Sequence, residues 1–283
     1  MIALNPDPLV SVIVPAYNHE KYINDCLRSV ADQSYENLEL IVINDGSADN
    51  TPELIKLFIA ENPRLNIRFL SKSNEGVCKT LNKGLEMAAG KYVTFLASDD
   101  MWEPEKLKTQ VDFMERNANL GLVFTDAWFL RFTERMNIKW SDYKNGIDKY
   151  FKNGVQNADM YFLLLIRPII PALTVMVRKK VFDETGGFDE KLVYEDLDMW
   201  LRIARKYPLG YIDSPLARYR IHDSNISNDT LLMMKGLLQT LKKHSAQMPL
   251  RSQPLRRGVL LMRLSFNLIS DRIRKMKKRG GEI

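Results

Sequence analysis

The sequence predicts an α/β protein built on a mostly parallel sheet flanked by helices. In the first hundred residues, four short apolar runs alternate with segments of helical periodicity, which is typical of parallel strands joined by right-handed crossovers. Each apolar run ends in a polar turn rich in Asn, Asp or Gly. The fourth run, 92–97, is followed by Ser98 and then by two adjacent carboxylates, Asp99 and Asp100.

The elements of the first half follow from these runs. Each run is short, continuous and rich in β-branched residues, which predicts strands over 9–14, 38–43, 67–70 and 92–97. Between them, apolar residues recur at helical spacing over 21–30, 51–60 and 77–88. Thr51 as N-cap and Pro52 at the first helical position mark the start of the second helix, and Gly90 marks the end of the third.

The second half is less regular. We predict helices over 105–114 and 179–185, a helix that starts near Asp196, and strands over 121–124 and 173–177. Residues 216–221 are predicted to form an edge strand that delivers His222. Residues 133–157 are polar, aromatic and weakly periodic, and we interpret them as a flexible loop over the site.

The polar turns predict a ligand site. Because the carboxyl ends of parallel strands meet at one edge of a sheet, the turns after the four strands should lie together, where α/β proteins bind ligands. These turns are 17–18, 44–46, 74–76 and 98–100. Turn residues favour Asn, Asp and Gly for conformational reasons, which explains any one of them. Their recurrence at every strand end favours a nucleotide-sized pocket.

Adjacent carboxylates repel unless a cation lies beside them, so Asp99 and Asp100 indicate a divalent metal whose remaining positions are filled by substrate phosphates. A solvated loop or a helix N-cap ahead of Pro104 would also account for them. Glu195 and Asp196 form a second acidic pair at a predicted helix start. There the helix macrodipole favours acids, so simple capping is the alternative to a catalytic role.

Composition indicates an ordinary globular protein. The chain has 283 residues, of which 45% are hydrophobic and 27% charged, enough for one large domain with an appendage. Cys26 and Cys78 are the only cysteines, and we expect reduced thiols in a cytoplasmic protein. We expect no signal peptide, because the N-terminus lacks a basic segment followed by an apolar one, and no apolar run reaches the ~18 residues of a membrane span.

Positive charge is concentrated in the tail. From Arg251 onward there are ten basic and two acidic residues, so the tail carries +8 and the remainder −2 of the net +6. This indicates an anionic partner at one end and argues against a nucleic-acid groove. Within 256–279 an apolar stripe with basic flanks predicts an interfacial helix on an anionic membrane. The same pattern would also fit a helix that packs on its own domain, or one that packs on a second copy of the chain to form a homodimer. The stripe comprises Val259, Met262, Phe266, Ile269, Ile273 and Met276.

Taken in order, the motifs resemble those of the inverting family 2 glycosyltransferases with the GT-A fold, of the type that synthesises bacterial polysaccharides. The resemblance covers roughly residues 9–227 and rests on the ordered set rather than on any single motif. The matching segments are Val12-Ile13-Val14-Pro15-Ala16-Tyr17-Asn18, Asn44-Asp45-Gly46-Ser47, Asn74-Glu75-Gly76, Phe95-Leu96-Ala97-Ser98-Asp99-Asp100, Glu195-Asp196 leading into Trp200-Leu201-Arg202, and Tyr219-Arg220-Ile221-His222.

The resemblance implies a GT-A catalytic domain over 1–227, with a donor-binding half over 1–100 and an acceptor-binding half over 101–227, and a basic helical extension over 228–283. It implies that Asp45 bonds the base, usually uracil, and that Ser98 and Asp99 lie beside the ribose. The other residues implied at the nucleotide are Pro15, Ala16, Tyr17, Asn18, Asn74 and Gly76.

The resemblance also implies that Asp100 binds Mn²⁺ or Mg²⁺ and that His222 lies close enough to contact the metal. It further implies that Asp196 is the general base, with the adjacent Glu195 as the alternative residue. One departure affects the metal: Ala97 stands where many members have Asp, so the ligand set is less certain than the cation. The chemistry is consistent, since a departing diphosphate needs positive charge and an acceptor hydroxyl must lose its proton. One in-line displacement inverts the anomeric centre.

The resulting function is a metal-dependent hexosyl- or N-acetylhexosaminyltransferase that uses a nucleotide sugar, with UDP as the expected carrier, and a glycan or polyprenyl-linked acceptor. We expect it in the cytoplasm, peripherally at the inner face of the plasma membrane. A sugar-nucleotide nucleotidyltransferase ranks below this, because that class should carry a Gly-rich basic loop where this chain has 15–18. A non-catalytic nucleotide-sugar-binding subunit stays open.

Overall fold

The computed structural model describes residues 7–131, 134–144, 146–193 and 195–246, and within them eleven strands form one sheet. The strands are β1 (Val10–Ala16), β2 (Leu38–Asp45), β3 (Ile67–Lys72), β4 (Tyr92–Phe95), β5 (Met101–Trp102), β6 (Leu122–Arg131), β7 (Glu134–Lys139), β8 (Phe151–Lys152), β9 (Val155–Gln156), β10 (Met176–Arg178) and β11 (Leu209–Ile221).

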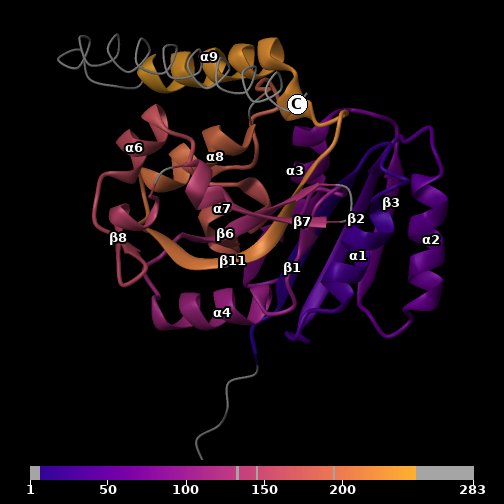
Figure 1. Ribbon diagram of the computed structural model, residues 1–283. Helices are drawn as coiled ribbons and strands as arrows, with labels where there is room; N and C mark the ends of the chain where they lie inside the picture. The colour runs from indigo at the N-terminus through magenta and orange to yellow at the C-terminus, as the bar shows by residue number, and fades with distance from the viewer. Residues whose placement is uncertain (1–6, 132–133, 145, 194, 247–283) are drawn as a thin grey trace, which may run out of the picture.

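Helices flank this sheet (Figure 1). The α-helices are α1 (Ile23–Ala31), α2 (Thr51–Glu61), α3 (Val77–Met87), α4 (Lys106–Arg116), α5 (Trp140–Tyr143), α6 (Met160–Ile166), α7 (Lys179–Thr185), α8 (Glu195–Ala204) and α9 (Thr230–Ala246). Short 3₁₀ turns occur at Asp148–Tyr150, Ala172–Thr174 and Ile226–Asn228.

Among the described residues the sheet is mixed: its four longest pairings are parallel, as predicted, and its six shorter pairings are antiparallel. Its strand order is β3-β2-β1-β4-β10-β6-β11-β9-β8, with β5 paired to β11 and β7 to β6. The first four strands pair in parallel, and β11 runs parallel to β6. β10 is inserted antiparallel between β4 and β6. The carboxyl ends of β1, β2, β3 and β4 therefore lie along one edge, which is what the polar turns required.

The sheet divides the core into two layers. Successive side chains of a strand point to opposite faces, so Val12 and Val14 of β1 pack with α1 and α2, whereas Ile13 packs with α3 and α8. β2 repeats the pattern, with Val42 on the first face and Ile41 on the second. Because both faces are covered, these strands are mostly apolar and lack the alternation of a half-exposed sheet. Two of their buried polar residues, Ser11 and Glu39, are hydrogen-bonded to each other.

The edge-strand prediction for 216–221 was wrong. β11 pairs with β6 along its length and with β5 and β9 on its other side. Both arginines of this segment, Arg218 and Arg220, have partners inside the protein. The Arg218 guanidinium donates to the Glu103 carboxylate, and Arg220 Nε donates to the Asp99 carbonyl. Internal acceptors thus allow charged residues in an interior strand.

Three other boundaries differ from the predictions. The predicted loop 133–157 contains β7, α5, β8 and β9, elements too short to produce a periodic pattern. Tertiary contacts stabilise this segment, such as the hydrogen bond from the Trp140 indole N–H to the Ile169 carbonyl. The predicted strand 173–177 is a 3₁₀ turn followed by β10. Asn50, one residue before Thr51, is the N-cap of α2.

The C-terminal extension begins with α9, which lies across α8 in Figure 1. Asp198 of α8 is fully buried and accepts hydrogen bonds from Lys243 Nζ and His244 Nε2 of α9, at 3.0 and 2.9 Å. This part of the extension is therefore anchored on the helix that carries Glu195 and Asp196. The predicted membrane or dimer helix, 256–279, lies outside the described residues.

Two sequence expectations about the chain's environment can be compared with the structure. Cys26 and Cys78 are buried free thiols, as expected for reduced cysteines. Within the described ranges, no helix combines the length and apolar character needed to cross a membrane.

Candidate active site

The turn after β1 is fastened to the loop after β2. The Asn18 N–H donates to Ser47 Oγ at 2.9 Å, and the Ala48 N–H donates to Asn18 Oδ1 at 2.8 Å. Asn18 has φ 53°, a left-handed conformation that Asn tolerates better than most residues. Tyr17 is 47% exposed beside it, and Pro15 and Ala16 are the last residues of β1. The first predicted nucleotide contact is thus a rigid, accessible turn.

Asp45, at the end of β2, organises the neighbouring loop. Its carboxylate accepts the backbone N–H groups of Glu75 and Gly76, at 3.0 and 2.9 Å, and pairs with Lys72 Nζ. Gly46 has φ +74°, and a Cβ there would lie 2.6 Å from Asn74 N, so only glycine fits. Asp45, Asn74 and Gly76 are therefore brought together as predicted. The carboxylate already has partners, and its contact with a base stays a prediction.

The end of β4 meets residues from two distant segments. Ser98 Oγ is hydrogen-bonded to His19 Nδ1 at 2.7 Å, and Asp99 Oδ2 is 2.9 Å from His222 Nε2. Asn225 Nδ2 also approaches Asp99 Oδ2, at 3.5 Å. One ligand atom from each of His19, Asp99 and His222 lies within 4.8 Å of the others. These three residues form a group that could hold a metal ion.

Asp100 lies outside that group. Its Oδ1 accepts the backbone N–H of Arg220 at 2.8 Å, and the side chain is only 4% exposed. The Arg220 guanidinium in turn donates to the Asp99 carbonyl at 2.7 Å and to Asp25 at 3.0 Å. The sequence paired Asp100 with His222 at the metal, whereas the structure places Asp99 beside His222 and directs Asp100 to β11.

The two adjacent carboxyl groups differ electrostatically. Burial raises the pKa of Asp99, but the hydrogen bond with His222 and the charge of His19 outweigh it and lower that pKa overall. Burial, and then the charge of Asp99, raise the pKa of Asp100 well above its usual value. The two carboxyl groups thus differ in their partners: Asp99 contacts His222, and Asp100 contacts the backbone of Arg220.

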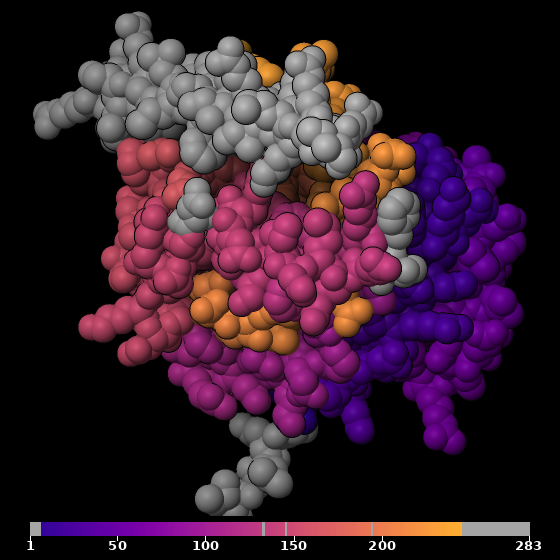
Figure 2. All heavy atoms as spheres, viewed as in Figure 1, coloured from indigo at the N-terminus to yellow at the C-terminus, as the bar shows by residue number. Residues whose placement is uncertain are grey.

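Aromatic contacts hold His222 in place. Its ring stacks on Tyr22 at the start of α1, with centroids 4.6 Å apart, and the Arg220 guanidinium lies 5.1 Å from the centroid of the same tyrosine. The segment after β11 thus lies against the N-terminal half of the chain, where orange spheres meet indigo ones in Figure 2. Burial lowers the pKa of His19 more than the nearby acids raise it, which favours its neutral, ligating form.

Glu195 and Asp196 occupy the first turn of α8. Both residues are partly buried, and desolvation is the main cause that raises the pKa of Glu195 to about 8 and that of Asp196 to about 7. The charge of Asp196 adds to the effect on Glu195. Asp196 Oδ1 accepts the N–H of Leu197 at 2.5 Å. Such perturbed carboxyl groups are typical of catalytic sites, although structural pairs show them too.

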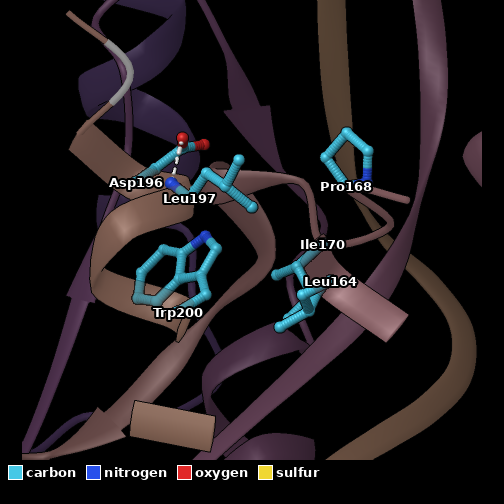
Figure 3. Close-up of a pocket in the computed structure, with 6 residues that line it drawn as sticks. All are labelled: Leu164, Pro168, Ile170, Asp196, Leu197 and Trp200. Carbon is cyan, nitrogen blue, oxygen red and sulfur yellow. Dashed lines mark hydrogen bonds between the residues drawn. The ribbon is translucent and has the colours of Figure 1, made fainter. Parts of the chain in front are cut away.

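A small hollow lies beside Asp196 (Figure 3). The Trp200 indole nitrogen is directed toward this space, and among the residues the structure describes it has no hydrogen-bond partner. A buried donor without a partner is unusual, and the hollow beside it is too small to admit a water molecule. The lining residues are Leu164, Pro168, Ile170, Asp196, Leu197 and Trp200.

The segment before α8 is fixed against the edge that carries the turns. The Phe188 ring packs edge-on against Phe95, the last residue of β4, with centroids 5.3 Å apart. The Asn82 side chain of α3 bonds both the N–H and the carbonyl of Phe188. Cys78, in the first turn of α3, donates to the Leu192 carbonyl at 3.5 Å, and the charge of Glu195 contributes to its raised pKa. The second acidic pair therefore approaches the helix that follows the Asn74–Gly76 loop.

Sequence reasoning missed His19 and Arg220 as site residues. His19 follows the Tyr17-Asn18 turn directly and is one of three histidines in the chain, a signal that was available. Arg220 lay within a quoted motif, but its contacts depend on β11 being an interior strand. The roles predicted for the other site residues stay predictions.

Comparison with known proteins points to one family. The family model described as Glycosyl transferase family 2 matches residues 11–185. TuaG from Bacillus subtilis (strain 168), whose provisional name assigns it to teichuronic acid biosynthesis, is 33% identical over 80% of this chain and 84% of its own length. The chain is 31% identical to uncharacterized glycosyltransferases of Rickettsia felis and Rickettsia conorii over 76% of its own length. The match covers only 34% of the length of those two proteins.

Two solved structures share the fold. The mannosyltransferase PcManGT from Pyrobaculum calidifontis, in complex with GDP-Man and Mn²⁺, superposes with a TM-score of 0.70 at 19% identity, covering 90% of this chain and 70% of that one. TarS from S. aureus (residues 1–349), in complex with UDP-GlcNAc, gives a TM-score of 0.62 at 21% identity, covering 89% and 79%. At these identities the likeness is one of fold, and it confirms the GT-A prediction.

Proposed function

Because the chain belongs to family 2 of the glycosyltransferases, we propose that it transfers a sugar from a nucleoside-diphosphate sugar to a hydroxyl group of a glycan or lipid-linked acceptor. The proposed reaction depends on a metal ion and inverts the configuration of the anomeric carbon. The observation that carries the proposal is the group of His19, Asp99 and His222 at the strand edge. The chain that leads into α8 packs against this edge through Phe188, whose ring contacts Phe95 at the end of β4. The setting fits surface polysaccharide synthesis, which the name of TuaG supports.

The donor is proposed to lie along the four turns. The Tyr17-Asn18 turn and Asp45 would hold the nucleoside, and Ser98 and Asp99 would lie at the ribose and diphosphate. TarS with UDP-GlcNAc and PcManGT with GDP-Man show that neighbours of this fold take different nucleotides. We favour UDP on the resemblance of the turns. The remaining residues proposed at the donor are Pro15, Ala16, Asn74 and Gly76.

The proposed metal ligands fit a divalent cation. One carboxylate and two imidazoles converge, and both histidines are only partly buried, so substrate oxygens can complete the coordination shell. When bound, Mn²⁺ or Mg²⁺ supplies positive charge to the departing diphosphate. PcManGT, solved with Mn²⁺, supports a metal in this fold. We assign the carboxylate ligand to Asp99 and give Asp100 the task of fixing the turn to β11.

Asp196 is the proposed general base. Its pKa of about 7 suits a group that must be ionised to accept the hydroxyl proton and must still hold that proton afterwards. Glu195 shares the raised pKa and is the alternative. The acceptor then attacks the anomeric carbon from the face opposite the diphosphate, which inverts the centre without a protein nucleophile.

We propose that residues 1–227 form the catalytic domain, with the donor half over 1–100 and the acceptor half over 101–227, and that the extension 228–283 serves localisation. Its basic segment 256–279 would bring the enzyme to an anionic membrane at the cytoplasmic face, where a polyprenyl-linked acceptor is found. Homodimerisation through the same segment is the competing proposal. Truncation after Gln247 distinguishes them, since loss of binding to anionic liposomes supports the first and loss of the dimer supports the second.

A donor panel tests the proposal. The full chain, incubated with Mn²⁺ and each of several UDP- and GDP-sugars, should release free nucleoside diphosphate slowly from one or two of them, because water replaces the missing acceptor. If the protein is instead supplied with a nucleoside triphosphate and a sugar 1-phosphate, formation of a nucleotide sugar with release of pyrophosphate would indicate a nucleotidyltransferase. Tight binding of a nucleotide sugar without release under any condition would indicate a binding subunit.

The pH dependence of sugar transfer should reflect the ionisation of Glu195 and Asp196. Asp196 must be deprotonated to act, so kcat/KM should rise with pH through the region of about 7 to 8 that the pair's raised pKa values define. Rates measured at saturating Mn²⁺ should keep this rise in Glu195→Gln and lose it in Asp196→Asn. A profile that is flat from pH 5 to 9 in the unmodified enzyme would remove both acids from the role.

A further inference from the structure

We propose that His19 is a third protein ligand of the active-site cation, so that two imidazoles and one carboxylate hold it and select a transition metal such as Mn²⁺ over Mg²⁺. The inference rests on the proposed function, since it deepens the metal site of Asp99 and His222. His19 comes from the turn after β1, whereas Asp99 follows β4 and His222 follows β11.

The two histidines each use Nδ1 for a hydrogen bond to a serine hydroxyl. His19 Nδ1 is hydrogen-bonded to Ser98 Oγ at 2.7 Å, and His222 Nδ1 is hydrogen-bonded to Ser224 Oγ at 2.8 Å. Each ring therefore has Nε2 available as the ligand atom, and His222 Nε2 is already 2.9 Å from Asp99 Oδ2. Metal-binding histidines usually have their second nitrogen held in this way, which fixes the tautomer and the ring plane.

His19 is also held by its backbone. Its N–H donates to Thr51 Oγ1 at 2.9 Å, and its carbonyl accepts from the N–H groups of Tyr22 and Ile23, both at 2.9 Å. Its ring makes edge-on contacts with those of Tyr22 and His222, with centroids 5.9 and 6.0 Å apart. The imidazole thus faces Asp99 in a fixed orientation, so little conformational freedom would be lost on binding a cation.

This donor set discriminates between metals. Mg²⁺ prefers oxygen ligands in near-ideal octahedral geometry, whereas imidazole nitrogen suits first-row transition ions. Three protein ligands leave positions for water and phosphate oxygens in an octahedral ion. With His222 alone, Mg²⁺ could replace one nitrogen contact by water at small cost. With His19 as well, two nitrogens define the site, and Mn²⁺ should be favoured.

Metal titration of the full chain tests the inference without relying on turnover. Mn²⁺ and Mg²⁺ affinities are measured by calorimetry, with the free Mn²⁺ signal in electron paramagnetic resonance as a second readout. His19→Gln should weaken Mn²⁺ binding by at least tenfold, on the order of what even an outer-shell ligand partner contributes, and should change Mg²⁺ binding less than threefold. Asp223→Asn, an exposed acid beside His222, is the matched control and should leave both affinities unchanged.

A spectroscopic measurement makes the test independent of variant folding. Electron spin-echo modulation of the Mn²⁺-loaded, unmodified protein should show coupling to two imidazole nitrogens, and His19→Gln should show one. Coupling to a single nitrogen in the unmodified protein, or equal weakening of Mn²⁺ and Mg²⁺ in His19→Gln, overturns the inference. If Asp99→Asn and His222→Gln also leave Mn²⁺ binding intact, the proposed metal site itself fails, which separates the two outcomes.

Discussion

Replacing Asp99 by Asn should reduce sugar transfer about a thousandfold, because a cation that neutralises a leaving diphosphate contributes several kcal/mol to the barrier and each 1.4 kcal/mol is about tenfold in rate. Asp99 contributes the carboxylate of the three converging residues, and its ionised form is favoured by the His222 hydrogen bond. Asn keeps the shape of the side chain but removes the negative charge. Mn²⁺ affinity, measured by calorimetry, should fall together with kcat.

Two further variants sharpen this prediction. Asp100→Asn should lose much less Mn²⁺ affinity than Asp99→Asn, because an amide oxygen can still accept the Arg220 N–H and the pKa of Asp100 is already raised. Asp223→Asn removes an exposed charge near His222 and should behave as the unmodified enzyme. If Asp100→Asn lost Mn²⁺ binding and Asp99→Asn kept it, Asp100 would be the metal ligand, as the sequence motif predicted.

This contrast shows where sequence reasoning stopped. The strand ends were predictable because apolar runs and turn residues are local signals, and the sheet brought their turns together as parallel pairing requires. Which of the two adjacent acids contacts His222 is not determined by local sequence. It depends on the backbone N–H of Arg220, which is 120 residues away and is brought to Asp100 by β11.

The misassigned segments have the same physical cause. Residues 216–221 were predicted to form an edge strand, but β11 pairs there with both β6 and β5, and Glu103 and the Asp99 carbonyl accept hydrogen bonds from its arginines. Residues 133–157 carry short elements whose stability comes from tertiary contacts, such as the bond from Trp140 to the Ile169 carbonyl. Periodicity cannot report partners that are distant in the chain.

The position of α8 connects the extension with the chemistry. Burial raises the pKa of Asp198, but hydrogen bonds from His244 and Lys243 and the charge of Arg202 lower it to about 2, so this carboxylate is ionised and firmly paired. These contacts hold α9 on the helix whose first turn carries Glu195 and Asp196. A partner that binds the extension would therefore contact a segment that is joined through α9 to α8, the helix that carries the proposed base Asp196.

Replacing Asp196 by Asn should lower kcat for transfer by at least a hundredfold, since a positioned general base contributes about 10²–10⁴. Glu195→Gln, its neighbour, should lose far less, and Asp183→Asn, an exposed acid on α7, should lose nothing. The KM for the donor should stay nearly constant in Asp196→Asn, because the proposed base acts on the acceptor. Normal transfer by Asp196→Asn, or a larger loss in Glu195→Gln, would move the role to Glu195 or away from the pair.

The same substitution should stabilise the fold at alkaline pH, which separates loss of chemistry from loss of structure. Desolvation raises the folded-state pKa of Asp196 to about 7, above the ~3.9 of an unfolded chain. The native state therefore holds a proton that the unfolded state has released, and stability falls as pH rises between these values. Asn carries no charge and avoids this loss. Thermal unfolding should give Asp196→Asn a higher Tm than the unmodified enzyme at pH 8, with the difference shrinking toward pH 4. An inactive variant that is also less stable at pH 8 would mean that Asp196 holds the helix together and does not act as the base.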